Sequence, residues 1–281
     1  MDISEEYQTE LFPYAYNILG SIDDARDVIQ DVIANHLETN PDNINNESAY
    51  LIKSVINKSI NLKKRSKKMV GQTTWLPEPI ATENADQKIN SQEIISYAML
   101  VLLEYLNPKE RAVFILKEAF DYSHEEIAEI FSITIETSRQ LLSRAKNTLK
   151  KHGSDFNLKT TSSVDVLSKY VDVIRKGDVK MLEEMLSGSI TALADGGGKG
   201  KMLSEFTSGA KAVALLALKG SQFLKKCRIE FGVLNHLPSL LFYQGDKLIC
   251  CQIFDVDTET GKIRNLYLVA DPRKLKNYEK R

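Results

Sequence analysis

The sequence of 281 residues contains no long apolar run. Its longest apolar stretches, residues 98–103 and 213–218, are far shorter than the roughly 20 residues that a membrane-spanning helix needs. The acidic N-terminus also lacks the basic and apolar regions of a signal peptide. These absences predict a cytoplasmic protein with no membrane partner.

Cysteine is also scarce, with three residues in the whole chain. Two of them, Cys250 and Cys251, are adjacent, and the set matches neither a disulfide framework nor the spacing of zinc ligands. We therefore expect buried, reduced thiols, and neither a metal ion nor another cofactor. We also find no internal repeat.

The formal net charge is only −1, but acidic and basic residues are segregated along the chain. Residues 1–47 hold eleven acidic side chains against the single basic Arg26, whereas residues 48–77 hold seven basic side chains and no acidic one. An acidic helical start favours a protein partner, and a basic block directly after it favours a phosphate backbone.

The length exceeds that of a usual single domain, and changes in composition divide the chain. We expect two helical regions, two polar linkers and a C-terminal α+β domain, with these boundaries: 1–70, 71–91, 92–152, 153–162 and 163–281.

Residues 123–151 have the pattern of a helix-turn-helix. Ser123 and Glu126 form a capping box for a short helix, residues 132–134 form a polar turn, and a longer helix begins near Ile135. One stripe of that second helix is small or apolar: Ser138, Leu142, Ala145 and Leu149. Polar side chains beside and opposite this stripe are candidates for major-groove contact: Glu136, Thr137, Arg139, Gln140, Ser143 and Arg144. The alternative is a solvated face on an ordinary helical hairpin.

Two helices near the N-terminus carry the segregated charge. The first of them, at 23–37, turns a polar set outwards: Asp24, Asp27, Gln30 and Asp31. The second, at 48–68, presents basic and amide side chains that can lie along nucleic acid: Asn57, Lys58, Asn61, Lys64 and Arg65. A solvated cationic face is the alternative for this second set.

The segment between the two helical regions has no sustained period. Its aromatic and proline-rich part, residues 75–79, holds the single tryptophan and is stiff, which favours an anchor that docks on another surface. Residues 92–106 are strongly apolar and predict one helix, and Asn107, Pro108 and Glu110 predict the start of the next.

The C-terminal part changes from helices to strands. We expect helices at 164–174, 179–186 and 210–218, strands at 190–193, 228–234, 240–243, 247–255 and 262–269, and a glycine-rich loop at 195–200. Helices followed by a meander predict an α+β domain with a curved antiparallel sheet.

Together, these segments resemble an extracytoplasmic-function sigma factor. DDARDVIQDVIANHL at 23–37 and AYLIKSVINKSINLKKRSKK at 49–68 resemble sigma region 2, and residues 107–131 and 136–151 resemble sigma region 4. The resemblance implies two all-α sigma domains that bind core RNA polymerase and promoter DNA. It assigns the polymerase contact to Asp24, Asp27, Gln30 and Asp31, and the two promoter elements to the basic helix and the helix-turn-helix.

Three short motifs are similar to those of the sigma subgroup with a C-terminal SnoaL-like extension. They are WLPEP at 75–79, DGGGK at 195–199 and ADPRKL at 270–275. This likeness implies regulation in cis through contacts of the following residues: Trp75, Leu76, Pro77, Glu78, Pro79, Asp195, Gly196, Gly197, Gly198, Lys199, Asp271, Pro272 and Leu275.

Two other functions are open at this point. SnoaL-like domains include cyclases and isomerases, in which Asp195, Asp255 or His236 could move a proton, but none of these residues has a catalytic partner readable from the sequence. We therefore expect no enzyme. A ligand-responsive helix-turn-helix regulator explains the architecture too, but not the acidic and basic helices, and a small-molecule ligand of the C-terminal domain is compatible with either reading.

Overall fold

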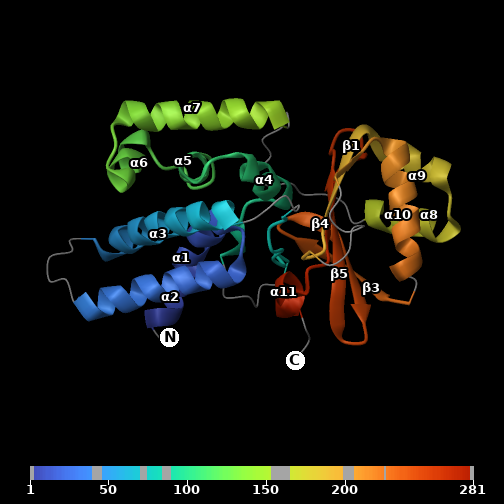
Figure 1. Cartoon of the computed structure of the whole chain (residues 1–281), viewed down its shortest axis with the longest axis horizontal. Coiled ribbons are helices and arrows are strands. Elements are labelled where there is room, and N and C mark those ends of the chain that lie inside the picture. Colours follow the sequence, from blue (N-terminus) through green and yellow to red (C-terminus); the bar gives the residue numbers. More distant parts are fainter. Residues whose placement is uncertain are drawn as a thin grey trace. The chain divides into compact units, whose positions relative to one another are not determined.

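The computed structural model (Figure 1) describes residues 3–39, 46–69, 75–83, 90–152, 165–198, 206–224 and 226–278. The chain divides into two compact units. The helical unit comprises Met1–Gly71 and Ala85–Leu158, and the C-terminal unit comprises Gln72–Asn84 and Lys159–Arg281. The segment around Trp75 therefore belongs to the C-terminal unit, although helices of the other unit flank it in the sequence.

Three helices open the helical unit: α1 (Ile3–Leu19), α2 (Ile22–Thr39) and α3 (Glu47–Met69). They pack against one another through an apolar core that includes Tyr16, Ile29, Leu51 and Ile56. Asp23 and Asp24 lie in the first turn of α2, where carboxylates are favoured by the helix dipole. α2 and α3 confirm the two helices that the sequence predicts at 23–37 and 48–68.

The helical unit continues with η1 (Ser91–Glu93), α4 (Tyr97–Leu102), η2 (Leu103–Tyr105), α5 (Pro108–Glu118), α6 (His124–Phe131) and α7 (Ile135–His152). The single helix expected over 92–106 is wrong. The carboxamide of Asn17 donates to the Glu93 carbonyl at 2.8 Å and accepts from the Ile95 N–H at 3.3 Å. These bonds hold the backbone near Ile94 outside a helix, and α4 starts afresh at the Ser96 cap.

A buried charged cluster links α1, α3 and α5. Lys63 Nζ donates to the Leu19 carbonyl at 2.8 Å and to Glu104 Oε1 at 2.9 Å. Arg111 pairs with the same carboxylate, and its Nε donates to the Asn17 carbonyl at 3.0 Å. Burial would raise the pKa of the Glu104 carboxyl, but the two cations and their hydrogen bonds hold it below its usual value.

After the segment at Gln72–Asn84, the C-terminal unit continues with helices α8 (Asp165–Lys176) and α9 (Val179–Met185) and ends with α11 (Pro272–Leu275) and η4 (Lys276–Tyr278). Its sheet comprises β1 (Leu186–Asp195), β2 (Phe206–Ser208), β3 (Arg228–Leu234), β4 (Leu237–Gln244), β5 (Lys247–Val256) and β6 (Ile263–Val269), with α10 (Ala210–Leu224) between β2 and β3. The strand order is β2-β1-β6-β5-β4-β3. Figure 1 shows α8, α9 and α10 together on one face of this sheet.

The sheet is mixed, whereas the sequence predicts an antiparallel one. β1 pairs with β6 in parallel, and the other neighbouring strands pair antiparallel. β1 is also longer than the expected 190–193, and α10 continues through Gly220 to Leu224 rather than ending at 218. The parallel pairing joins strands far apart in the sequence, so no local turn signal announces it.

Helices and sheet enclose an apolar core. Leu167, Leu182, Val213 and Phe254 are buried in it, and the rings of Tyr170 and Phe254 meet edge to face at 4.8 Å. Cys250 and Cys251 are buried free thiols, as the sequence predicts, while Cys227 is free and half-buried. Burial raises the pKa of the Cys251 thiol to about 12. Within the described ranges, no helix has the length and apolar character needed to cross a membrane.

Candidate nucleic-acid interface and linker-docking site

The helix-turn-helix consists of α6 and α7. Ser123 Oγ accepts from the Glu126 N–H at 3.1 Å, and Glu126 Oε2 accepts from the Ser123 N–H at 2.7 Å, so the predicted capping box is present. The turn begins at Ser132, which has left-handed backbone with φ of 50°. His124 Nδ1 and Ser138 Oγ lie 2.9 Å apart and join the two helices.

The predicted two-sided character of α7 is confirmed. Its inner stripe is buried: Ser138, Leu142, Ala145 and Leu149. Five of the six predicted base-contact residues are exposed, namely Glu136, Arg139, Gln140, Ser143 and Arg144. Thr137 is half-buried, and its hydroxyl lies 2.8 Å from that of Thr134. The outer face of α7 is therefore accessible to a groove of DNA, and contact with bases remains a prediction.

The basic face of α3 is partly occupied by the protein itself. Asn61, Lys64 and Arg65 are exposed, whereas Asn57 and Lys58 are half-buried. Asn57 Nδ2 donates to the Lys53 carbonyl at 2.9 Å and to the Ile130 carbonyl of α6 at 3.5 Å. Lys53 Nζ also donates to the Glu129 carbonyl at 3.0 Å. The end of α6 thus lies against this face of α3.

The acidic set on α2 is mostly open to solvent. Asp27, Gln30 and Asp31 are exposed, and Asp24 is half-buried near the start of the helix. Asp31 Oδ2 accepts from Lys58 Nζ at 2.8 Å, although the sequence assigns these two residues to different partners. An exposed pair of this kind contributes about 0–1 kcal/mol to the stability of the fold.

The WLPEP segment docks within the C-terminal unit. The Leu76 N–H donates to Asp195 Oδ2 at 2.9 Å, and Leu76, Pro77, Glu78 and Pro79 are buried. Lys274 Nζ binds the same carboxylate oxygen at 2.6 Å, donates to the Leu76 carbonyl, and lies 4.4 Å from the centre of the Trp75 ring. Burial lowers the pKa of Lys274, and the Asp195 charge opposes this effect. The buried ion pair of Asp195 with Lys274 therefore links the three motifs WLPEP, DGGGK and ADPRKL.

A second contact follows directly along the segment. The Ile80 N–H donates to Asn235 Oδ1, and the Asn235 N–H donates to the Ile80 carbonyl, both at 2.8 Å. Asn235 and His236 form the turn between β3 and β4 and have φ of 45° and 63°. Tyr278 OH donates to the Pro79 carbonyl at 2.9 Å. The segment is thus held largely through its backbone groups. The sequence predicts that it docks as an anchor, but not these backbone contacts.

The glycine loop packs tightly against α11. Gly197 and Gly198 have φ of 65° and 80°, and the Gly197 N–H donates to Asp195 Oδ1 at 2.9 Å. A Cβ atom added at Gly197 would lie 2.6 Å from Asp271 Cγ, whereas one at Gly198 would meet no atom within 4 Å. Asp271 caps α11 by accepting from the Arg273 N–H, and Arg273 holds the pKa of this carboxyl below its usual value.

The structure brings most of the predicted regulatory residues together. Leu275 is buried beside Lys274, Gly196 follows Asp195 at the end of β1, and Pro272 begins α11. Lys199 lies outside the described residues. Lys274, Asn235 and Tyr278 also contact this segment and are not among the residues predicted from the sequence. The position of Lys274 inside the ADPRKL motif was the one available signal for it.

The three candidate catalytic residues have structural partners. Asp195 binds Lys274 and Leu76, and Asp255 accepts from Arg264 at 3.2 Å and from Asn265 at 2.7 Å. His236 occupies the β3–β4 turn, where its N–H donates to Thr82 Oγ1 at 2.9 Å. Across the described residues, His, Cys, Asp and Glu side chains form no group of three or more that could hold a metal ion.

Comparison with known proteins agrees with this geometry. The family model described as Sigma-70, region 4 matches residues 96–149, which include α5, α6 and most of α7. The ECF RNA polymerase sigma factor SigJ of Mycobacterium tuberculosis is 24% identical over 295 residues, covering 98% of this chain and 93% of the relative. The probable ECF RNA polymerase sigma factor SigI of the same organism is 22% identical, covering 96% and 92%.

The fold is shared as well. The crystal structure of the Mycobacterium tuberculosis extracytoplasmic function sigma factor SigJ matches with a TM-score of 0.76 at 22% identity, covering 97% of this chain and 96% of that one. The chain is thus a homologue of the extracytoplasmic-function RNA polymerase sigma factors, with a match to sigma-70 region 4 and a C-terminal α+β domain.

Proposed function

We propose that the protein is a promoter-specificity subunit that binds core RNA polymerase and promoter DNA and has no catalytic chemistry of its own. The observation that carries the proposal is the region 4 helix-turn-helix, whose outer face on α7 is exposed and polar, in a chain homologous over nearly its whole length to sigma factors. This role also places it in the cytoplasm, with the polymerase.

In this proposal the acidic face of α2 meets basic polymerase surface. Asp24, Asp27, Gln30 and Asp31 supply this contact, which should weaken as salt concentration rises. Asn57, Lys58, Asn61, Lys64 and Arg65 on α3 serve the start-proximal promoter element. The outer face of α7 serves the upstream element through Arg139 and its neighbours.

We further propose that the C-terminal unit regulates the protein in cis through the docked segment at 75–83. This segment connects the two DNA-binding regions in the sequence, so holding it shortens the reach between them. The contact of α6 with Lys53 and Asn57 must also open before the basic face of α3 is free. Docking of the segment is therefore coupled to the spacing of the two DNA-binding faces.

Run-off transcription with bacterial core RNA polymerase tests both parts. Templates are genomic fragments that include the region upstream of the gene, and the proteins are the full chain, Lys274→Met and Lys262→Met. We expect promoter-specific transcripts, with an output changed by Lys274→Met and unchanged by Lys262→Met, because Lys262 is an exposed lysine in a hairpin turn. If the full chain neither gives transcripts nor binds core polymerase, the sigma proposal fails; equal output from all three proteins defeats the regulatory part alone.

The specificity of α7 is tested by two further variants. Arg139→Ala should cost about 1–3 kcal/mol of binding energy at a base pair where Arg139 contacts guanine, and should relax the sequence preference there. Lys150→Ala should weaken binding to all sequences alike, since a cation at the flank of the helix meets phosphate. Equal losses for Arg139→Ala on matched and mismatched promoters contradict the base contact.

A further inference from the structure

β3 forms one edge of the sheet in the C-terminal unit, and among the described strands only β4 pairs with it. The strand contains no proline and keeps one register with β4 from Arg228 to Leu234, without a bulge. Edge strands that stay single are usually short, bulged or interrupted by proline. The other edge strand, β2, has only three residues. β3 instead has the length and regularity of a strand that pairs on both sides.

The docked segment at 75–83 already uses the end of this edge. The Thr82 N–H donates to the Val233 carbonyl at 3.1 Å, so the backbone groups of Val233 point away from β4. Backbone groups alternate in direction along a strand, and those of Ile229 and Phe231 therefore also point away from β4. A strand added beside β3 would form its hydrogen bonds with these two residues.

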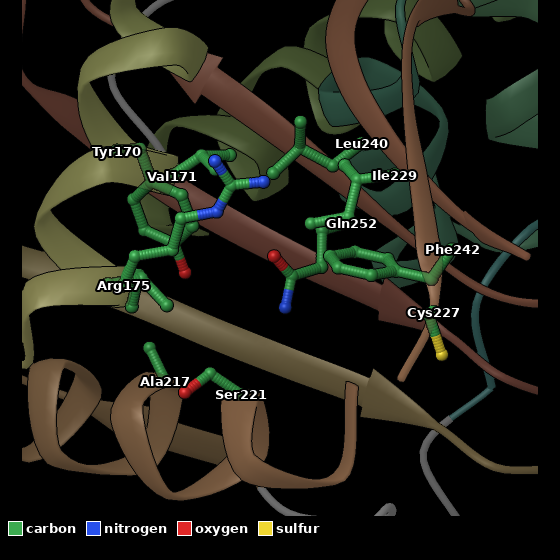
Figure 2. A pocket seen from close by; sticks show the side chains of 11 residues that line it. Tyr170, Val171, Arg175, Ala217, Ser221, Cys227, Ile229, Leu240, Phe242 and Gln252 are labelled. Atoms are coloured by element: carbon green, nitrogen blue, oxygen red, sulfur yellow. The ribbon is translucent and has the colours of Figure 1, made fainter. Parts of the chain in front are cut away.

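The side chains along this edge differ between the two faces of the sheet. Cys227 and Ile229 line the pocket shown in Figure 2, on the face that the helices cover. Phe231 follows on that face by alternation, but it is 46% exposed. Arg228 and Glu230 lie on the opposite face, where they pair with each other and remain partly open to solvent. The edge thus has an exposed ring on one face and two opposite charges on the other.

We propose that β3 pairs with β3 of a second copy of this chain, antiparallel about a two-fold axis at Ile229. Outward-pointing residues must lie opposite each other in such a pair, so the axis passes through a residue. An axis at Arg228 or Glu230 would place like charges directly opposite, which is unfavourable. An axis at Phe231 would require Val233, which the docked segment holds. The axis at Ile229 avoids both conflicts.

This register is complementary on both faces. Arg228 lies opposite Glu230 of the second copy, and the same contact repeats across the axis, so four charges alternate in sign. Phe231 lies opposite Cys227 of the second copy, a free and half-buried thiol that suits contact with an aromatic ring. Because the pair spans only residues 227–231, it buries a small area and forms a weak dimer. The inference concerns self-association alone and is independent of the transcriptional role.

Sedimentation equilibrium of the full chain, at increasing concentration up to the millimolar range, measures this dimer. Arg228→Glu and Glu230→Arg each place like charges opposite one another, so each variant alone should associate about tenfold more weakly than the wild type. An equimolar mixture of the two should recover the wild-type affinity, because each variant supplies the charge that the other lacks. Lys262→Glu makes the same change in net charge as Arg228→Glu on an exposed hairpin turn, and it should leave association unchanged.

A second pair of variants tests the backbone contact. Phe231→Pro removes an N–H that β4 does not use, so it should preserve the fold, checked by circular dichroism, and weaken association about tenfold. Phe231→Leu keeps this N–H and should retain the dimer. A wild-type protein that stays monomeric at millimolar concentration overturns the proposal, and so does a mixture of folded charge variants that associates no better than either alone. If a charge variant fails to fold, the proline variant decides, since undiminished association of Phe231→Pro overturns the proposal as well.

Discussion

Each compact unit buries a lysine that holds distant parts of the chain together, but the two lysines have different surroundings. Lys63 in the helical unit shares the Glu104 carboxylate with Arg111, so two cations meet one anion. Lys274 in the C-terminal unit pairs alone with Asp195, which also accepts from the Leu76 N–H. Among the described residues, the helical cluster thus has two cations for one anion, whereas the C-terminal pair has one of each.

The Lys63 cluster has the surroundings of a purely structural contact, whereas the Lys274 pair has those of a contact that can be regulated. The groups around Lys63 lie on helices that pack through a large apolar core, so the cluster is one of many contacts. Lys274 instead binds the Leu76 carbonyl of an extended segment that lies outside the sheet and helices of its unit and is held by backbone hydrogen bonds, an aromatic ring and buried side chains. A short segment of this kind can detach without unfolding of the unit.

The largest effect is expected in the helical cluster. Glu104→Gln leaves Lys63 and Arg111 buried and charged with no carboxylate between them, so we expect a loss of about 3–5 kcal/mol in the free energy of unfolding. Urea unfolding followed by far-ultraviolet circular dichroism measures it. Stability should be lost in the wild-type protein as pH falls through the lowered pKa of Glu104, since this group stabilises the fold when ionised.

Glu118→Gln is the matched control for this variant. Glu118 pairs with Lys146 at 2.8 Å on the surface of the same unit, and both side chains are partly exposed. Its removal should cost less than about 1 kcal/mol. If Glu104→Gln costs no more than this control, the buried cluster is no stronger than a surface pair and the comparison with Lys274 loses its basis.

In the C-terminal unit, Asp195→Asn should cost about 2–3 kcal/mol at pH 7, since it strands one buried cation rather than two. Lys274 can also release its proton, which Arg111 cannot. The single tryptophan, Trp75, lies in this unit, so its fluorescence follows the unfolding of the docked segment.

The pH dependence of Asp195→Asn follows from the lowered pKa of Lys274. Burial already lowers this pKa, and loss of the Asp195 charge lowers it further below the unfolded value of about 10.4. Between the two pKa values the unfolded chain binds more protons, so stability rises with pH. The variant should therefore recover part of its loss as the pH rises from neutral towards the unfolded pKa of lysine. Lys274→Met should show no such recovery, and identical pH profiles of the two variants would contradict the assignment.

The sequence predicts the helix-turn-helix well because its signals are local. The capping box of Ser123 with Glu126 and the stripe from Ser138 to Leu149 lie within the elements they specify. The two buried lysines give no such signal, since a lysine is almost always exposed. Glu104 is 41 positions from Lys63, and Asp195 is 79 positions from Lys274, so both pairings arise from tertiary structure.

Contacts between residues distant in the sequence also explain why the helix expected at 92–106 and the antiparallel sheet are wrong. Apolar residues over 92–106 predict a helix, but Asn17, 76 and 78 positions away from its backbone partners, holds part of the segment extended. The parallel pairing of β1 with β6 also depends on a distant strand. For the docked segment, proline and tryptophan indicate an anchor, while the backbone partners of Leu76 and Ile80 appear only in the folded unit.

Two neighbouring glycines test how closely the loop must approach α11. Gly197→Ala and Gly198→Ala both place a Cβ on backbone with positive φ, which costs roughly 1 kcal/mol each. Only the Cβ at residue 197 would collide with Asp271, the cap of the helix that carries Lys274. Gly197→Ala should therefore cost about 1 kcal/mol more than Gly198→Ala in tryptophan-monitored unfolding. Equal costs would show that the approach to Asp271 is not tight.

The smallest effect concerns the ring beside Lys274. Trp75→Leu keeps apolar bulk but removes the cation–π contact at 4.4 Å, so we expect a loss of about 1 kcal/mol, measured by scanning calorimetry because the variant lacks tryptophan. In the Lys274→Met background the same change should be nearly neutral, and the difference between the two backgrounds gives the coupling energy directly. A coupling energy near zero would mean that Trp75 anchors the segment through apolar burial alone. The ion pair and the aromatic anchor would then be separate holds on the linker, each of which could be released without the other.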